Sequence, residues 1–193
     1  KLLINFTWWL NRQDPDGNNL FGGGFLGLDN ISAIDRSHLP PGYVLEQADG
    51  TAWMAYYALG MLVIAQVLAA RNEVYDDMVV KFGEQFVMIA DALERAGIYD
   101  QADGFFYDLL KDSSGAETPI EVRTLVGAIP LLPSLELTPR NTERAERLHK
   151  RLARALEAQG TQDSEIRVHL TPLGEDRLLL TLVSVDQLSR ALN

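Results

Sequence analysis

The sequence predicts a mainly α-helical fold with short β additions. Residues 52–70 carry no charged side chain, and residues 74–96 place apolar side chains every three or four positions. No strand–helix–strand alternation is visible, which argues against a parallel sheet covered by helices. The chain has 193 residues, of which 47% are hydrophobic and 23% charged, so its composition is that of a globular protein with a core.

The first 50 residues predict the end of a helix and then a long loop. Residues 2–10 are mostly apolar and should be helical, closing near Arg12. Three turn-forming clusters break every helical pattern over 13–50: Asp14-Pro15-Asp16-Gly17, Gly22-Gly23-Gly24 and Pro40-Pro41-Gly42. Because the loop also contains many apolar residues, we expect it to be ordered, and ordered loops of this length often carry function.

The next two helices form a predicted hairpin. Asp49 or Thr51 can cap a helix that runs to about residue 70, because a short side-chain oxygen can accept a hydrogen bond from a first-turn amide. A turn at Arg71-Asn72 leads to a second helix over roughly 74–96, which stops at Gly97. The predicted buried face of this second helix consists of Val79, Phe82, Phe86, Ile89 and Leu93.

The remaining residues predict short strands and two further helices. The candidate strands are Phe105-Phe106-Tyr107, Ile120-Glu121-Val122 and two short strands within 166–183. Thr138-Pro139 opens a helix, and Ser184 with Gln187 forms a capping box for a last helix. The helix after Pro139 has a predicted buried face made of Ala145, Leu148, Leu152 and Ala155 or Leu156.

We expect one partial domain over residues 1–193. The chain starts with Lys1 rather than Met and stops at Asn193 inside a predicted helix, so we interpret it as an internal fragment of a longer protein. Its predicted parts are a helix end and pocket loop over 1–50, a helical hairpin over 51–97, an irregular segment with short strands over 98–137, and a helix, short strands and a truncated helix over 138–193.

The charge argues against nucleic acid as a partner. Lys and Arg number 17 against 27 Asp and Glu, a formal charge of −10, whereas binding to a phosphate backbone needs a cationic face. Residues 138–160 form a basic stretch, but Glu143 precedes Arg147 and Glu146 precedes Lys150 at helical ion-pair spacing. We therefore interpret this stretch as a solvated helix face.

The uncharged run 52–70 is nearly long enough to cross a membrane. It contains Gly60, Gln66 and many alanines, which favour a helix buried in a large helical protein. We expect no membrane partner. Because no export signal is visible, we expect a cytoplasmic location.

Signatures of nucleophilic, nucleotide and metal chemistry are missing. The sequence has no cysteine, no G-x-S-x-G, no P-loop and no H-E-x-x-H. Its three histidines, His38, His149 and His169, are far apart in the chain. We expect no metal and no other cofactor.

Carboxylates are the remaining candidates, and they gather in and just after the long loop. Asp29 follows apolar residues, and desolvation can raise the pKa of such a group, which suits a general acid. Nearby aromatic rings offer flat apolar faces for a sugar: Trp8, Trp9, Phe21, Phe25 and Trp53. The pattern favours a carbohydrate ligand.

Each carboxylate also has a structural interpretation. Asp29 can form an Asx turn, and Asp35 can pair with Arg36. Asp49 can be only a helix cap, and Glu46 can be exposed.

Several motifs, taken in order, resemble a known family. They are Asn5-Phe6-Thr7-Trp8-Trp9-Leu10-Asn11-Arg12, Phe21-Gly22-Gly23-Gly24-Phe25-Leu26-Gly27-Leu28-Asp29-Asn30, Leu45-Glu46-Gln47-Ala48-Asp49-Gly50-Thr51-Ala52-Trp53-Met54, Asp103-Gly104-Phe105-Phe106-Tyr107-Asp108 and Val122-Arg123-Thr124-Leu125-Val126-Gly127. The sequence resembles bacterial proteins of the glycoside hydrolase family 63 type, the glucosidase and mannosylglycerate-hydrolase-like group. The resemblance is clear over about residues 1–135 and looser beyond.

The resemblance implies an (α/α) toroid of six helical hairpins in which helix 51–70 is an inner helix. It also implies an inverting α-glycosidase acting on an α-glucoside or related glycoside, with Asp29 of Gly27-Leu28-Asp29 as the general acid. The implied or candidate substrate-binding residues are Trp8, Trp9, Phe25, Asn30, Glu46, Gln47, Asp49 and Trp53.

One part of the family pattern is missing. The family's general base is a glutamate much nearer the C-terminus of the domain, and no segment here matches that region, although Asp35, Glu46 or Asp108 could lie at the required distance. We expect this chain alone to be inactive and its partner to be the remainder of the parent catalytic domain. An incomplete ring would leave part of helix 51–70 exposed and make the isolated chain marginally stable or prone to aggregation.

Two other interpretations stay open. One is a non-catalytic carbohydrate-binding or interaction module that lacks the base. The other is a different six-hairpin sugar enzyme, such as an epimerase or a trehalase relative, although the scarcity of histidine argues against an epimerase.

Overall fold

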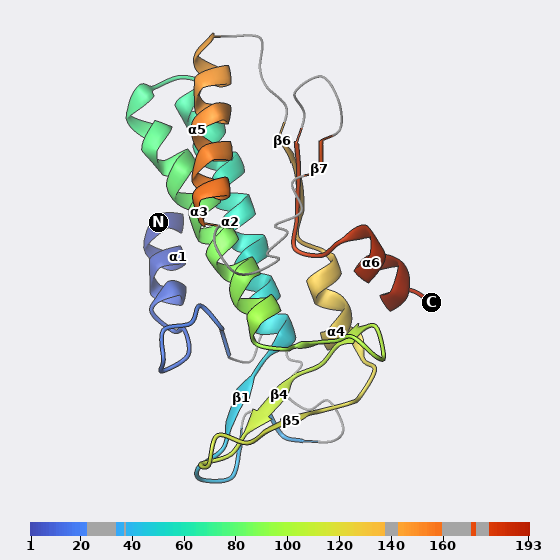
Figure 1. Ribbon diagram of the computed structural model, residues 1–193. Coiled ribbons are helices and arrows are strands. Elements are labelled where there is room, and N and C mark those ends of the chain that lie inside the picture. The colour runs from blue at the N-terminus through green and yellow to red at the C-terminus, as the bar shows by residue number, and fades with distance from the viewer. Residues whose placement is uncertain (23–33, 37, 138–142, 160–170, 173–177) are drawn as a thin grey trace.

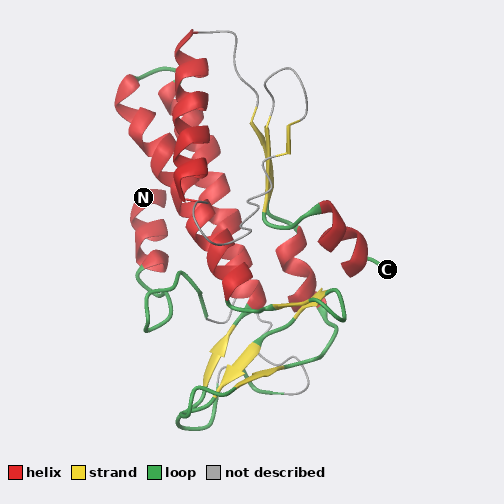
Figure 2. Ribbon diagram, viewed as in Figure 1, coloured by secondary structure: helices red, strands yellow, loops and turns green. Residues whose placement is uncertain are grey.

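The computed structural model describes residues 1–22, 34–36, 38–137, 143–159, 171–172 and 178–193 (Figure 1). The helices are α1 (Leu2–Leu10), α2 (Ala48–Ala69), the 3-10 helix η2 (Glu73–Tyr75), α3 (Asp76–Arg95), α4 (Leu125–Ala128), the 3-10 helix η3 (Ile129–Leu131), α5 (Glu143–Gln159) and α6 (Val185–Ala191). The strands are β1 (Val44–Glu46), β2 (Tyr99–Asp100), β3 (Phe105–Phe106), β4 (Leu109–Lys111), β5 (Glu117–Pro119), β6 (Ser134–Leu137), β7 (Thr171–Pro172) and β8 (Leu178–Thr181). Long helices and short strands confirm the mainly α-helical class (Figure 2).

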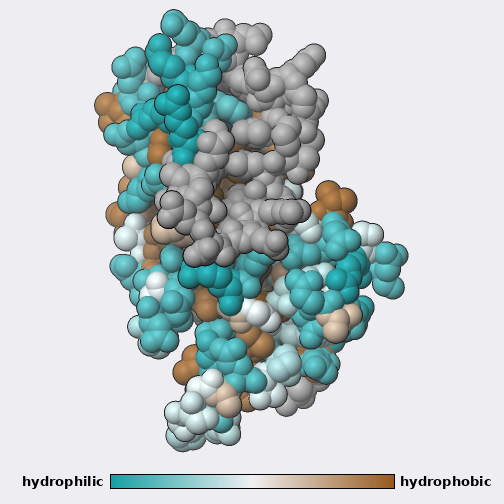
Figure 3. Space-filling model, in the orientation of Figure 1, coloured by the Kyte–Doolittle hydropathy of each residue, from teal (hydrophilic) through white to brown (hydrophobic). Residues whose placement is uncertain are grey.

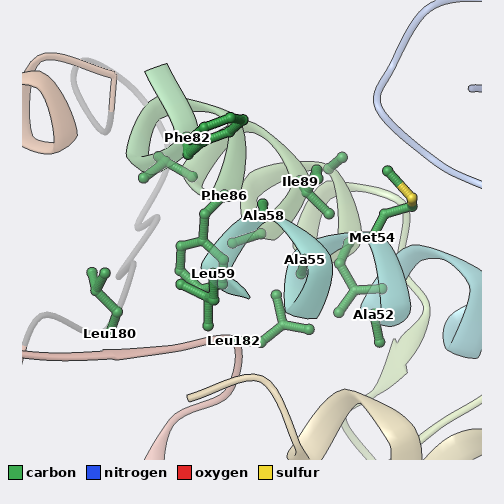
Figure 4. Close-up of a cluster of buried hydrophobic side chains, with 14 of the residues drawn as sticks. Ala52, Met54, Ala55, Ala58, Leu59, Phe82, Phe86, Ile89, Leu180 and Leu182 are labelled. Atoms are coloured by element: carbon green, nitrogen blue, oxygen red, sulfur yellow. The ribbon is translucent and has the colours of Figure 1, made fainter. Parts of the chain in front are cut away.

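The core lies between the two long helices α2 and α3. The predicted buried face of α3 is confirmed, because none of its five side chains is more than 2% exposed. Alanines of α2, among them Ala55 and Ala58, face the large side chains of α3 such as Phe86 (Figure 4). Small side chains on one helix let the axes approach closely, so burial is extensive without large residues on both sides.

Two further helices flank this hairpin. Phe6 of α1 lies edge-on to Tyr57 of α2 and to Phe82 of α3, with ring centroids 5.1 and 5.3 Å apart. On the other side α5 packs against α3 at Gly83, where an added Cβ would lie 2.1 Å from Leu152 Cδ1. Leu152 is buried as predicted, and Figure 3 shows a hydrophilic surface over the outer side of α5.

The remaining predictions for the C-terminal part of the chain concern the surface of α5 and the start of α6. Leu148 is half-buried, and the expected ion pair between Glu143 and Arg147 forms at 3.7 Å. Thr138 and Pro139, and the side chains of the other predicted core residues of this helix, lie outside the described part of the chain. The capping box of α6 is confirmed: the Gln187 amide donates to Ser184 Oγ at 3.0 Å, and the Ser184 amide donates to Gln187 Oε1 at 2.8 Å.

Three small antiparallel sheets complete the fold. Their strand orders are β1–β4–β5, β2–β3 and β6–β8–β7. β3 and the pair β7 and β8 confirm predicted strands, but the predicted strand at Ile120–Val122 is wrong. The Ile120 amide donates to the backbone oxygen of Asp108 at 2.8 Å, and the Val122 amide turns back to the oxygen of Ile120 at 2.7 Å. β5 therefore ends at Pro119, just before this turn.

One face of α2 is exposed although it is apolar. Five positions at helical spacing form it, and we call them the α2 stripe: Tyr56, Gly60, Val63, Ile64 and Val67. Part of this helix is therefore exposed among the described residues. Among the described residues, α2 is also the one helix long and apolar enough to cross a membrane, a test that core helices pass as well.

Replacement of Gly127 by alanine should destabilise the chain. An added Cβ would lie 2.2 Å from the backbone oxygen of Phe106 and 2.2 Å from Cε1 of Phe105. We expect a loss of about 1–3 kcal/mol, measured by urea unfolding. Gly60→Ala is the matched control, because a Cβ there meets nothing within 4 Å and alanine favours helix by about 0.5–1 kcal/mol. Equal stabilities of the two variants would contradict the tight packing at Gly127.

Candidate functional site

Buried charges gather at the N-terminal end of α2. Arg36, Asp49 and Asp108 are at most 8% exposed, and they come from the long loop, the first turn of α2 and the link between β3 and β4. Glu46 and Gln47, at the junction of β1 with α2, are also buried. Buried charges cost free energy unless they are paired, so such a cluster is either a structural support or a functional site.

Arg36 holds the two buried aspartates together. Its Nη1 donates to Asp49 Oδ2 at 3.1 Å, and its Nη2 forms a close ion pair with Asp49 Oδ1. Its Nε lies 3.0 Å from Asp108 Oδ2, which is an ion-pair distance without hydrogen-bond geometry. We call these three residues the Arg36 clamp. Among the described residues, the clamp therefore pairs one positive charge with two carboxylates.

The capping of α2 differs from the prediction. The helix starts at Ala48, earlier than expected, and neither Asp49 nor Thr51 is its cap. The residue before it, Gln47, makes no side-chain cap. Instead the Ala48 amide donates to Oδ1 of Asp108 at 2.9 Å, so an oxygen from 60 positions away satisfies the helix end. Asp49 and Thr51 then lie inside the first turn, where their side chains are free to bind Arg36 and Phe21.

Burial raises the pKa of Asp108 from its ordinary 3.8 to about 6. The positive charge of Arg36 and the Ala48 amide oppose the rise, and the negative charge of Asp49 adds to it. A carboxyl with this pKa exchanges its proton in mildly acidic solution, and such groups are candidates for functional roles.

The raised pKa of Asp108 predicts that the chain loses stability as the pH rises from about 4 to about 6.5. In this window the folded state holds a proton that the unfolded state has lost, so unfolding releases a proton and higher pH favours it. The full effect is on the order of 3 kcal/mol. Urea midpoints across this range measure it, and Asp108→Asn should flatten the profile. Glu46, whose pKa burial also raises, contributes in the same direction. An unchanged slope in Asp108→Asn would contradict the assignment.

The described residues on both sides of segment 23–33 are fixed to the first turn of α2. On one side the Phe21 amide donates to Thr51 Oγ1 at 3.0 Å, and an added Cβ at Gly50 would lie 2.5 Å from the Phe21 oxygen. On the other side Arg36 binds Asp49. Three predicted site residues lie within this segment, outside the described residues: Phe25, Asp29 and Asn30.

Glu46 lies beside a small open hollow. Its Oε1 pairs with Lys111 Nζ at 2.5 Å, and Lys111 also pairs with Glu117 at 2.9 Å. Its Oε2 is buried and has no hydrogen-bond partner among the described residues. Desolvation raises the pKa of Glu46, and Lys111 opposes the rise. The hollow has a volume of about 190 Å³, and residues including Arg12 and Asp14 line it. It could admit a small polar group such as a hydroxyl.

Three of the predicted aromatic residues, Trp8, Trp9 and Trp53, lie on two neighbouring helices. Trp53 is half-buried in α2, packs edge-on against Tyr56 at 5.8 Å, and has a buried Nε1 without a partner among the described residues. Trp8 and Trp9 of α1 pack edge-on at 4.8 Å, and Arg12 lies over the Trp8 ring at 3.9 Å. The structure thus brings Glu46, Gln47 and Asp49 together, with Trp53 one turn further along α2. Trp8 and Trp9 stand apart on α1.

The sequence did not predict that Arg36 pairs with Asp49 and Asp108. The sequence suggests only Asp35 as a partner for Arg36, and Asp35 contacts His38 at 3.1 Å. Asp108 directly follows a buried aromatic run, a signal that could have indicated burial. No pattern marked Lys111 as the partner of Glu46. Within the described ranges, no group of three His, Asp or Glu side chains could hold a metal ion.

Comparison with known proteins finds a relative that is itself uncharacterized. No protein-family model and no solved structure matches the chain. The whole chain is 38% identical, over 211 residues, to the uncharacterized protein YMR196W of Saccharomyces cerevisiae. The aligned part is 19% of that protein, so the chain spans about a fifth of the length of this relative.

Proposed function

We propose that these 193 residues are part of the catalytic domain of an inverting glycoside hydrolase that acts on an α-glucoside or a related glycoside. One observation carries the proposal: the chain on both sides of the segment containing Asp29 is fixed to the start of α2, next to buried carboxylates. Three of the motifs that resemble the glycosidase family contribute a residue to this place: Phe21, Asp49 and Asp108. Asp29 is the proposed general acid.

The surroundings support this chemistry. A site with more buried carboxylate than cation raises the pKa of a neighbouring acid and keeps its proton available for a leaving group. Glu46 and Gln47 offer hydrogen bonds to sugar hydroxyls, and Trp53 offers an aromatic face. An inverting enzyme needs a second carboxylate about 6.5–9.5 Å from the acid. We propose that this base comes from the remainder of the parent domain, an (α/α) toroid in which α2 and α3 form one hairpin.

The stereochemistry of the product tests the proposal. The full-length yeast relative is incubated with a panel of aryl α-glycosides, and the first-formed anomer is followed by proton NMR. We expect the β-anomer first, and no hydrolysis by the 193-residue chain alone. Retention of configuration, or no turnover on any glycoside, would overturn the proposal. Turnover by the 193-residue chain would show that its own carboxylates suffice. Sugar binding by the relative without hydrolysis would instead favour a carbohydrate-binding module.

A further inference from the structure

Among the described residues, the α2 stripe is an exposed apolar face of a helix that is mostly buried elsewhere. At 100° per residue, its five positions fall within about 100° of the helix circumference. Most of the remaining circumference packs against α3, α1, α4 and η3, although Leu68 is also exposed. No charged residue interrupts the stripe. An exposed, continuous apolar face of this kind marks an interaction site more often than chance exposure does.

Helix α1 forms a wall beside the stripe. Tyr57, next to Tyr56 in α2, donates from its hydroxyl to Asn5 Oδ1 at 2.9 Å. On α1, Lys1, Ile4, Asn5 and Trp8 line an open hollow of about 460 Å³. Ile4 and Trp8 are 75% and 48% exposed. The stripe and this side of α1 are exposed apolar surfaces on two helices that contact each other, and we refer to them together as the α1–α2 groove.

We propose that the α1–α2 groove binds an amphipathic α-helix supplied by polypeptide outside these 193 residues. The stripe spans twelve residues, from Tyr56 to Val67, a rise of about 16 Å or three helical turns. Gly60 lies near its middle with open space around it, which lets a second helix axis approach closely. Because the stripe carries no charge, the helix that binds to it must present an apolar face.

The length of the relative indicates where such a helix comes from. All of this chain, with both helices of the groove, aligns to 19% of the yeast protein, so four-fifths of that polypeptide is available to cover the same face. This inference does not depend on the proposed enzymatic function.

Other occupants fit the groove less well. A bilayer in contact with the stripe would also meet α3, which packs along α2 and carries exposed charges such as Asp77, Lys81 and Glu94. In a second copy of this chain, the apolar helix α2 is itself flanked by its own α1 and η3. It therefore cannot enter the groove as a free helix.

Crosslinking in the full-length yeast relative tests the proposal. A photoactivatable phenylalanine analogue is placed at the residue aligned with Ile64 and, as a control, at the residue aligned with Val74, which is 77% exposed on η2. We expect the first position alone to crosslink within the same molecule to a segment outside the aligned region. Crosslinks to a second copy, to lipid, or only within the aligned region would overturn the proposal, as would no crosslink.

Thiol labelling checks the isolated chain, which has no cysteine of its own. In Ile64→Cys a maleimide should react about as fast as in Val74→Cys, because the groove is empty without its occupant. Strong protection of Ile64→Cys in the monomeric chain would show that the groove is already filled and would contradict the inference.

Discussion

Replacement of Asp29 by asparagine is expected to lower kcat by about 10²–10⁴-fold in a polypeptide that contains the complete proposed domain. Asparagine keeps the size of the side chain but cannot donate a carboxyl proton to the leaving oxygen. The yeast relative, changed at the residue aligned with Asp29, provides the test. The loss should be largest for glycosides with poor leaving groups, since an activated aryl group leaves with little protonation.

The control is an exposed carboxylate of the same loop. Asp16→Asn, made at the aligned position, removes a charge at the surface and should leave kcat within a factor of about two. A relative with no carboxylate aligned to Asp29, or an Asn variant with full activity on all substrates, would remove this residue from the mechanism.

Replacement of Arg36 by methionine is expected to destabilise the chain by about 3–5 kcal/mol. The substitution leaves Asp49 and Asp108 buried without the cation that pairs with both. A loss of this size is comparable to the whole stability of many domains, so the variant should be largely unfolded at neutral pH in mild urea. Urea unfolding followed by circular dichroism measures it. Lower pH should recover part of the loss, because Asp108, whose pKa burial raises, can then be buried in the neutral form.

Two variants make this test specific. Arg123→Met breaks an exposed pair with Asp103, formed at 2.9 Å, and should cost far less stability than Arg36→Met. The triple variant Arg36→Met, Asp49→Asn, Asp108→Asn removes all three charges and should be more stable than Arg36→Met alone. If Arg36→Met and Arg123→Met were equally stable, the clamp would contribute nothing to the fold.

The sequence predicted the parts of the fold that depend on local patterns. The spacing of Val79, Phe82 and Phe86 defined the buried face of α3, and Ser184 with Gln187 marked the start of α6, because both signals lie within a few residues. The start of α2 was misplaced because its first amide is satisfied by Asp108, far along the chain. Strands β1 and β6 were missed for the same reason: each is only three or four residues long and is defined by a distant partner.

In the candidate site too, the sequence predicted residues that are close in the chain but not the contacts between distant ones. The sequence singled out Glu46, Gln47 and Asp49, which are neighbours in the chain and remain neighbours in the structure. It could not pair Asp49 with Arg36 or Glu46 with Lys111, since no periodicity relates these positions. A single arginine in a loop carries no local signal that it will be buried.

The long reach of the Arg36 clamp also implies an order of events during folding. Helices α2 and α3 are consecutive and can pack early, because closing a short connection costs little chain entropy. The clamp joins residue 36 to residue 108 and must wait until the strands between them have formed. Its contacts should therefore be absent from the transition state, so that losing them accelerates unfolding while refolding keeps its rate. The clamp then slows unfolding and so determines the lifetime of the folded N-terminal end of α2.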